Sequence, residues 1–141
     1  MIAVDVNVLV YAARREFAQH EVARSWLTAA LGGREPVAVL DEVLAATVRL
    51  LSNHRVLATP LTGEQALEYC EAVRGAPAAT AATPGPARWT VFAELMREHD
   101  LRGNDVPDAL LAAGALSLGA RLATFDRGFR RFAELEVVVP A

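Results

Sequence analysis

The chain has 141 residues, of which 53% are hydrophobic and 22% are charged, a balance typical of a globular protein and not of a disordered or fibrous one. All fourteen basic residues are arginine, so three mechanisms that need a lysine are excluded: a Walker A phosphate loop, a Schiff-base enzyme and a response-regulator receiver domain. The net charge of −3 does not by itself indicate nucleic-acid binding, because nucleic-acid-binding domains are usually basic.

No segment is expected to carry the chain to a membrane or to an oxidising compartment. The first residues form a strand-like run without the basic start and long apolar stretch of a signal peptide. The longest uncharged helical run, residues 109–120, is shorter than the roughly 18 residues that a membrane span needs. A single cysteine, Cys70, excludes an internal disulfide. We therefore expect a soluble protein of the reducing cytoplasm.

The first half of the chain alternates short apolar runs with helical patterns. Residues 2–6 are predicted to form a buried strand that contains one aspartate, and residues 7–15 to form a connection. Apolar residues at helical spacing predict a helix over residues 20–31. Residues 37–40 form a second apolar run that leads at once into a helical pattern through Leu44, Val48 and Leu51.

The second half continues this alternation. Thr62 followed by Gln65 resembles a capping box and predicts a helix to about residue 74. Residues 75–86 are rich in Ala, Pro and Gly and are predicted to be a loop with a short strand near residues 78–83. Helices are expected over residues 88–99 and from residue 106 to about residue 119. The last elements are two strands, residues 121–124 and 136–139, with a turn and short helix at residues 126–132 between them.

Strands that alternate with helices predict an α/β fold with right-handed crossovers. We expect a mainly parallel central sheet of about five strands, flanked by helices on both faces. Neither an internal repeat nor a linker is visible, so residues 1–141 are expected to form a single domain. In such sheets, ligands bind at the carboxyl ends of the strands.

Four acidic residues are predicted to meet at that edge of the sheet. Asp5 lies at the end of the first strand, Glu42 just beyond the second, and Asp126 just beyond the strand that contains Thr124. Asp108 lies in the first turn of its helix, where the helix dipole favours an anion. These residues are therefore the candidate catalytic and metal-binding groups.

Convergent carboxylates repel one another unless a cation neutralises them. The hard ions Mg²⁺ and Mn²⁺ take oxygen ligands and are typically held by a few carboxylates together with substrate phosphates. Such an ion lowers the pKa of a bound water, and a pair of ions can clamp the attacking and leaving oxygens of a phosphodiester displacement. The pattern therefore predicts metal-dependent phosphodiester hydrolysis.

Each of the four carboxylates also has a purely structural interpretation. Asp5 could cap a turn, although an acid inside an apolar strand is costly without a partner. Asp126 could start a turn, and Asp108 could only stabilise a helix N-terminus. Glu42 stands beside Asp41, which would begin the helix equally well.

Several other polar and aromatic residues are expected to be structural. Asp105 is predicted to be the N-cap of its helix and not a ligand. Trp26 and Trp89 fit apolar helix faces and are predicted to pack in the core. The three histidines share no metal-ligand spacing and are expected to be structural or on the surface: His20, His54 and His99.

Three stretches of the chain resemble the PIN-domain toxins called VapC, the ribonuclease half of bacterial toxin–antitoxin pairs. They are the opening MIAVDVNVLVYA, the stretch RGNDVPDALLAAGALSLGARLATFDRGFRRF and the closing LEVVVP. The resemblance spans nearly the whole chain, and the combination of GN-x-VPDA with T-x-D-x-x-F in this order is specific.

The resemblance implies an endoribonuclease that depends on Mg²⁺ or Mn²⁺, forms homodimers and is inhibited by a small VapB antitoxin. Asp5, Asp108 and Asp126 match the family's acidic metal positions, and Asn7 and Thr124 match its supporting polar positions. Arginines near the site are the predicted contacts for the RNA backbone, because phosphate contacts dominate the affinity and lysine is absent: Arg127, Arg130 and Arg131.

Two departures from the family pattern concern the metal ligands. Many relatives carry a second acid two residues after the aspartate that matches Asp126, where this chain has Gly128. Many also carry a helix glutamate three residues before an arginine, a position that Ala46 occupies if Arg49 is that arginine. Glu42 lies one turn earlier on the same helix face and is the expected substitute.

Two further functions are alternatives to a ribonuclease. A catalytically degenerate PIN domain would bind RNA or a partner protein without cutting. A phosphatase of the haloacid-dehalogenase type would also place an aspartate after its first strand, but it needs a second aspartate two residues later and a lysine. This chain has Asn7 at that place and no lysine, which argues against the phosphatase.

Overall fold

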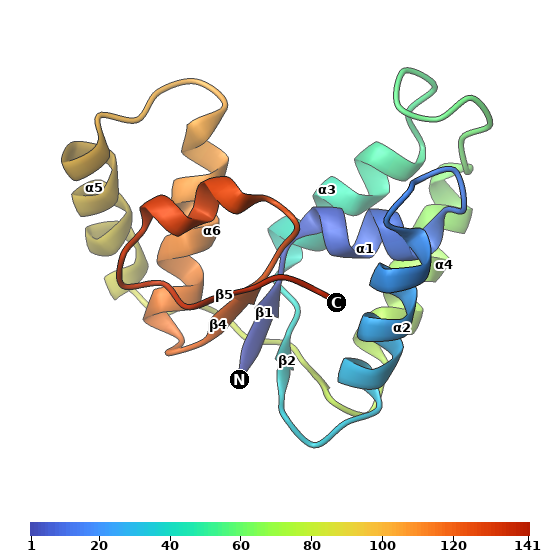
Figure 1. Cartoon of the computed structure of the whole chain (residues 1–141), viewed down its shortest axis with the longest axis horizontal. Coiled ribbons are helices and arrows are strands. Elements are labelled where there is room, and N and C mark those ends of the chain that lie inside the picture. The colour runs from blue at the N-terminus through green and yellow to red at the C-terminus, as the bar shows by residue number, and fades with distance from the viewer.

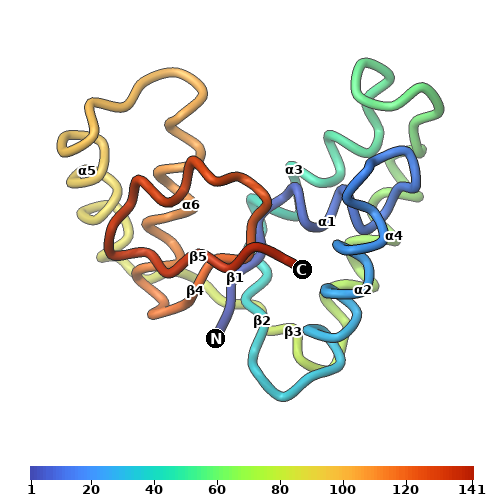
Figure 2. The backbone as a smooth tube through the Cα atoms, viewed as in Figure 1, coloured from blue at the N-terminus to red at the C-terminus, as the bar shows by residue number.

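A computed structural model describes residues 1–141 and contains a five-stranded, fully parallel sheet in the order β3-β2-β1-β4-β5. The expected sheet is confirmed, including the short strand within the alanine- and proline-rich segment. Figure 2 labels all five strands along the backbone. Their bounds are Ile2–Val4 for β1, Val37–Ala38 for β2, Ala79–Thr80 for β3, Arg121–Ala123 for β4 and Val137–Val138 for β5.

Helices flank the sheet on both sides. In Figure 1, α1 to α4 gather to the right of the strands, and α5 and α6 lie to the left. No helix is both long enough and apolar enough to cross a membrane. The helices are α1 Val6–Ala13, α2 His20–Leu31, α3 Asp41–Leu51, α4 Gly63–Arg74, α5 Ala87–His99 and α6 Asp105–Ser117, and a 3₁₀ turn, η1, spans Arg127–Arg131.

The central strand β1 sets the position of the candidate site. In the sheet register, Ile2 lies opposite Val37 of β2 and opposite Arg121 of β4, and Val4 lies opposite Ala123. Because these strands are parallel, their carboxyl ends reach the same edge of the sheet. The residues that follow β1, β2 and β4 therefore leave the sheet side by side.

Local signals placed several elements correctly. Helix α2 has the expected bounds, and the capping box of α4 is formed in both directions. The backbone N–H of Gln65 donates to Thr62 Oγ1 at 3.1 Å, and the backbone N–H of Thr62 donates to Gln65 Oε1 at 3.0 Å. Cys70, on the same helix, is a buried free thiol.

The segment after β1 was expected to be a connection, and this prediction was wrong. Residues 6–13 form helix α1, and β1 ends at Val4, so that Asp5 is the helix N-cap and not part of a strand. The helix is apolar on nearly every side because it is packed against α2 and α3, so it has no polar face that would produce a helical period.

Two single-residue predictions also fail. Trp89 is 70% exposed on α5 and does not pack in the core, whereas Trp26 is partly buried against the core as expected. Asp105 is the first residue inside α6, after the N-cap position of Asn104. Its carboxylate pairs instead with Arg131, at 3.2 Å between Oδ1 and Nη1.

Candidate active site

Asp5 is held in one orientation at the junction of β1 and α1. The residue is 6% exposed, and Oδ1 accepts a hydrogen bond from the backbone N–H of Val6 at 2.7 Å. Its Oδ2 accepts from Thr124 Oγ1 at 2.6 Å and from Asn7 Nδ2 at 3.0 Å. Three donors thus offset much of the cost of burying this carboxylate.

Asn7 and Thr124, the two predicted supporting residues, connect the ends of β1 and β4. Thr124 is fully buried, and its Oγ1 accepts from Asn7 Nδ2 at 3.2 Å and from the backbone N–H of Asp126 at 3.0 Å. Asn7 Oδ1 accepts from the backbone N–H of Phe125 at 3.2 Å. The network fixes Asp5 relative to the backbone that carries Asp126.

Three of the four predicted carboxylates line one cavity of about 170 Å³. Asp5 comes from the end of β1, Glu42 from the first turn of α3 and Asp108 from the first turn of α6. The remaining walls are apolar: Val6, Val43, Ala46, Pro107, Leu110 and Leu111. The fold therefore brings together acidic groups that lie up to about a hundred residues apart in the sequence.

Asp126 does not line this cavity, but its charge acts on the residues that do. It is exposed at the start of η1, where Oδ1 accepts from the backbone N–H of Gly128 at 2.7 Å. Its negative charge contributes to the raised pKa of both Asp5 and Asp108. Asp126 therefore belongs electrostatically to the cluster, while its side chain also serves as a turn cap.

The cluster is unfavourable for negative charge. Burial raises the pKa of Asp108 to about 6, and the charges of Asp5 and Asp126 add to the effect. Burial also raises the pKa of Asp5, and the hydrogen bonds from Thr124 and Val6 oppose that rise. Carboxylates in such surroundings gain most from a nearby cation.

Two arginines neutralise part of this charge in the protein itself. Arg131 Nη2 lies 3.4 Å from Asp108 Oδ2, so this predicted RNA contact is partly buried and paired with the site. Arg88 forms an ion pair with Glu42 and was not expected from the sequence. No local pattern reveals such a residue, because Arg88 and Glu42 are separated by 46 positions and meet only through tertiary packing.

The candidate ligands have the chemistry of a site for a hard divalent ion. All four candidate ligands are carboxylates, with no histidine or cysteine among them, which suits Mg²⁺ or Mn²⁺ and not zinc. As the side chains stand, no three acidic, histidine or cysteine residues converge closely enough to hold an ion. The chemistry of the donors fits a hard divalent ion, and closing them around one requires side-chain rotation at Glu42, Asp108 or Asp126.

The structure shows what surrounds Ala46 and Gly128, the two positions that depart from the family pattern. Ala46 lines the same cavity as Glu42, so a glutamate at either position of α3 would face Asp5 and Asp108. A Cβ at Gly128 would lie 2.9 Å from Asp126 Oδ1, which is too close for an unchanged Asp126. A second acid at position 128 would therefore require Asp126 to abandon its turn-capping rotamer.

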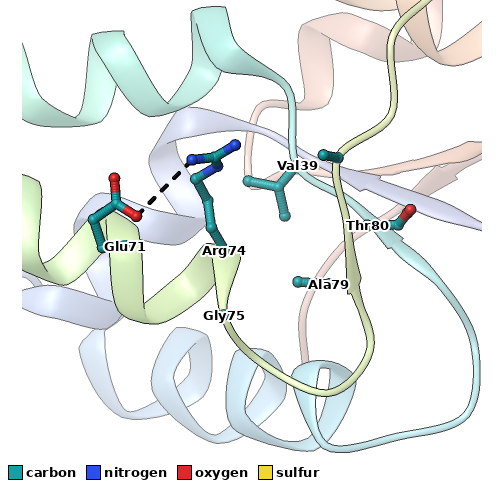
Figure 3. Close-up of a pocket in the computed structure, with 7 residues that line it drawn as sticks. Val39, Glu71, Arg74, Gly75, Ala79 and Thr80 are labelled. Carbon is teal, nitrogen blue, oxygen red and sulfur yellow. Dashed lines mark ion pairs between the residues drawn. The ribbon is translucent and has the colours of Figure 1, made fainter.

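A larger cavity, of about 260 Å³, lies elsewhere and contains none of the four carboxylates. It is formed by the end of α4 and by residues of and after β2 and β3, as Figure 3 shows. Arg74 and Glu71 pair loosely across one helical turn, at 3.9 Å, and both side chains are well exposed. Without convergent or buried polar groups, this cavity offers no comparable chemistry.

Comparisons with known proteins agree with the fold. The family model described as PIN domain matches residues 2–135. The chain is 41% identical to ribonuclease VapC43 of Mycobacterium tuberculosis over 135 residues, which cover 96% of this chain and 92% of the relative. The chain belongs to the VapC branch of the PIN-domain family. It is also 33% identical to ribonuclease VapC25 of Mycobacterium tuberculosis, over 99% of each chain.

Solved structures support the same PIN fold. VapBC2 from Rickettsia felis, bound to a DNA fragment from its promoter, gives a TM-score of 0.72 at 20% identity and covers 98% of both chains. VapC20 of Mycobacterium tuberculosis, described as a toxin that cleaves the sarcin–ricin loop, gives 0.70 at 21% identity and covers 94% of this PIN domain and 95% of its own chain.

The raised pKa of Asp108 predicts how the stability of the metal-free PIN domain depends on pH. Its pKa rises from 3.8 to about 6 on folding, so the stability that this group contributes is fully present below about pH 4 and is lost as the pH rises through 6. In EDTA at pH 7.5, Asp108→Asn should therefore unfold at a higher temperature than wild type. The side chain is 33% exposed, so the gain should be only about 1 kcal/mol, or roughly 3 °C.

Thermal unfolding at pH 4 and pH 7.5 in EDTA measures this difference. The advantage of Asp108→Asn should shrink or reverse at pH 4, where wild-type Asp108 is protonated. A variant that is less stable than wild type by the same amount at both pH values would show that the carboxylate is not destabilised by its surroundings.

Proposed function

We propose that this PIN domain is a divalent-metal-dependent endoribonuclease and the toxin of a type II toxin–antitoxin pair. The single observation that carries the proposal is the cavity shared by Asp5, Glu42 and Asp108, with the charge of Asp126 acting on it. The names of its relatives as VapC ribonucleases support RNA as the substrate. The reaction is hydrolysis of RNA phosphodiester bonds.

The carboxylates Asp5, Glu42, Asp108 and Asp126 would hold Mg²⁺ or Mn²⁺. When bound, such an ion would supply an activated water and would neutralise charge on the phosphate. The protein supplies positioning: Thr124 and Asn7 donate to Asp5 Oδ2 and keep that carboxylate at the edge of the sheet. Burial shields Asp5, which is 6% exposed, from water and strengthens the electrostatic interactions of that carboxylate.

The RNA backbone would be held by arginines of η1. Arg127 and Arg130 are exposed directly after Asp126, whereas Arg131 is partly buried and faces Asp105 and Asp108. We therefore assign the main phosphate contacts to Arg127 and Arg130, and a smaller role in RNA binding to Arg131.

Replacing both Arg127 and Arg130 by alanine should weaken RNA binding and flatten its salt dependence. Each lost phosphate contact on a single strand lowers the slope of log affinity against log salt by about 0.7, so the double variant should lose about 1.4. Binding is measured in a cleavage-deficient Asp5→Asn background, with Arg55→Ala as the exposed control. An unchanged slope would assign these arginines to another surface.

The partners follow from the same family membership. A cognate VapB-like antitoxin is proposed as the inhibitor, in line with the VapBC complexes among the similar structures. We further propose a homodimer, a cytoplasmic location and a single domain over residues 1–141. Light scattering of the purified protein alone and with its antitoxin tests the assembly.

One observation favours a second candidate, a degenerate PIN domain that binds RNA without cutting it. No three ligands converge as the side chains stand, and Asp108 already faces Arg131. Such a protein would bind RNA in Mn²⁺ and leave it intact.

Incubation of the pure protein with total cellular RNA distinguishes the two candidates. The ribonuclease should cut in Mg²⁺ or Mn²⁺ and not in EDTA, and mapping of the cut ends should give a restricted set of sites. Intact RNA in every condition, together with measurable RNA binding, would establish the degenerate alternative.

A further inference from the structure

The side chain of Arg88 forms hydrogen bonds to residues of two other helices. Its side chain leaves the first turn of α5, is 18% exposed, and reaches across α6. Nε and Nη2 donate to the carbonyl of Leu110 at 3.3 and 3.2 Å, and Nη2 also donates to Glu42 Oε1 on α3. One guanidinium therefore connects three helices, two of which carry candidate ligands.

The guanidinium of Arg88 packs against the backbone of α6 at Gly114. A Cβ at that position would lie 3.4 Å from Cζ, Nε and Nη2 of Arg88, so the guanidinium lies directly against the helix surface. Nη2 donates to both the main-chain carbonyl and the carboxylate, and Nε of the same planar fork adds a second donor to the carbonyl. A lysine ammonium has a single nitrogen and cannot supply that second donor.

The ion pair with Arg88 restricts the side-chain conformation of Glu42, which has few other contacts to hold it. Its side chain is 39% exposed at the first turn of α3, and a free glutamate there would sample several rotamers. Arg88 uses only Oε1, which leaves Oε2 available to a cation in the cavity shared with Asp5 and Asp108.

We propose that Arg88 is a positioning residue that holds Glu42 against this cavity and thereby raises the affinity of the carboxylate cluster for a divalent ion. This role rests on the proposed function, because it assumes that Glu42 is a metal ligand. Partners that orient metal ligands typically change metal affinity by about 10–100-fold when they are removed.

A double-mutant cycle with Mn²⁺ alone tests the role without any RNA. Calorimetric titration gives the Mn²⁺ Kd of wild type, Arg88→Met, Glu42→Gln and the double variant. Arg88→Met should weaken Mn²⁺ binding by about tenfold, and the same change in the Glu42→Gln background should have no further effect. Arg88→Lys, which keeps the charge but loses the fork, should be intermediate.

Two controls separate positioning from folding. Arg97→Met makes the same change at an exposed position of α5 and should leave the Mn²⁺ Kd unchanged. Melting temperatures in EDTA show whether each variant is folded. If Arg88→Met does not fold, the Mn²⁺ Kd of Arg88→Lys still tests the role.

The outcomes distinguish this role from the proposed function itself. If wild type binds Mn²⁺ and cuts RNA, but Arg88→Met and Arg88→Lys bind Mn²⁺ as tightly as wild type or more tightly, the positioning role is overturned alone. An equal loss on removing Arg88 with and without Glu42 would also overturn it. A wild-type protein that binds no Mn²⁺ would contradict the metal-dependent function, and this role of Arg88 with it.

Discussion

Asp5→Asn is expected to reduce RNA cleavage by at least about a hundredfold, a loss of about 2.7 kcal/mol in transition-state stabilisation. The change removes the most deeply held carboxylate of the cluster. It also mismatches the hydrogen bonds, because Oδ1 and Oδ2 both accept in the native structure and an asparagine can accept on only one side. The measurement is kcat/KM for a fluorogenic RNA in Mn²⁺.

The same mismatch should destabilise the fold by about 1–3 kcal/mol, so folding must be verified for this variant. Asp100→Asn is the matched control. Asp100 is 91% exposed and has a φ of 47°, a left-handed conformation that asparagine tolerates well. A folded Asp5→Asn protein that retains more than about a tenth of wild-type activity would remove Asp5 from the site.

Glu42→Gln should reduce cleavage by at least about tenfold, or about 1.4 kcal/mol, whereas Asp41→Asn should leave it nearly intact. The two side chains are rotated by about 100° around α3. Glu42 lines the cavity with Asp5 and Asp108, and Asp41 is exposed and does not line it. The comparison of kcat and KM for the two variants on the same RNA gives the answer.

Asp41→Asn is a suitable control because Asp41 does not cap helix α3. The N-cap of α3 is Leu40, without a side-chain cap, so Asp41 stabilises the helix only through its charge near the N-terminus. Wild-type cleavage by Glu42→Gln would leave the site to the three aspartates, and equal losses in both variants would point to the charge of the helix start and not to a ligand.

The sequence predicted the structure best where a local pattern of residues is compatible with only one kind of structure. The capping box of Thr62 and Gln65 fixed the start of α4, and the alternation of strands with helices gave the parallel sheet. The placement of Asp5 at the same edge of the sheet as the residues that follow β2 and β4 also came from this topology, since parallel strands share one carboxyl edge.

Secondary structure and burial were predicted wrongly where the local sequence does not distinguish a polar face from an apolar face of the element. Helix α1 is apolar on nearly all sides, so neither a helical nor a strand period stands out. Trp89 occupies an apolar position in its helix, yet that face meets solvent in the single chain. Burial depends on which element lies opposite, and that information is not local.

The sequence also did not reveal which side chains form ion pairs with residues far away in the chain. Arg131 was predicted to contact RNA, and its ion pairs with Asp105 and Asp108 were not expected from the sequence. Arg88 had no sequence signal at all, although it contacts a candidate ligand. The three-dimensional packing of α3, α5 and α6 determines both pairings.

The most direct test of the account is an anomalous diffraction measurement on crystals grown in Mn²⁺. We expect a manganese peak bound by oxygens of Asp5 and Asp108, with Glu42 or Asp126 rotated into the same coordination sphere. That peak should be absent in crystals of Asp5→Asn grown under identical conditions. If crystals of a protein that cuts RNA in Mn²⁺ contain no manganese at these carboxylates, or contain it only elsewhere, the proposed metal centre is wrong.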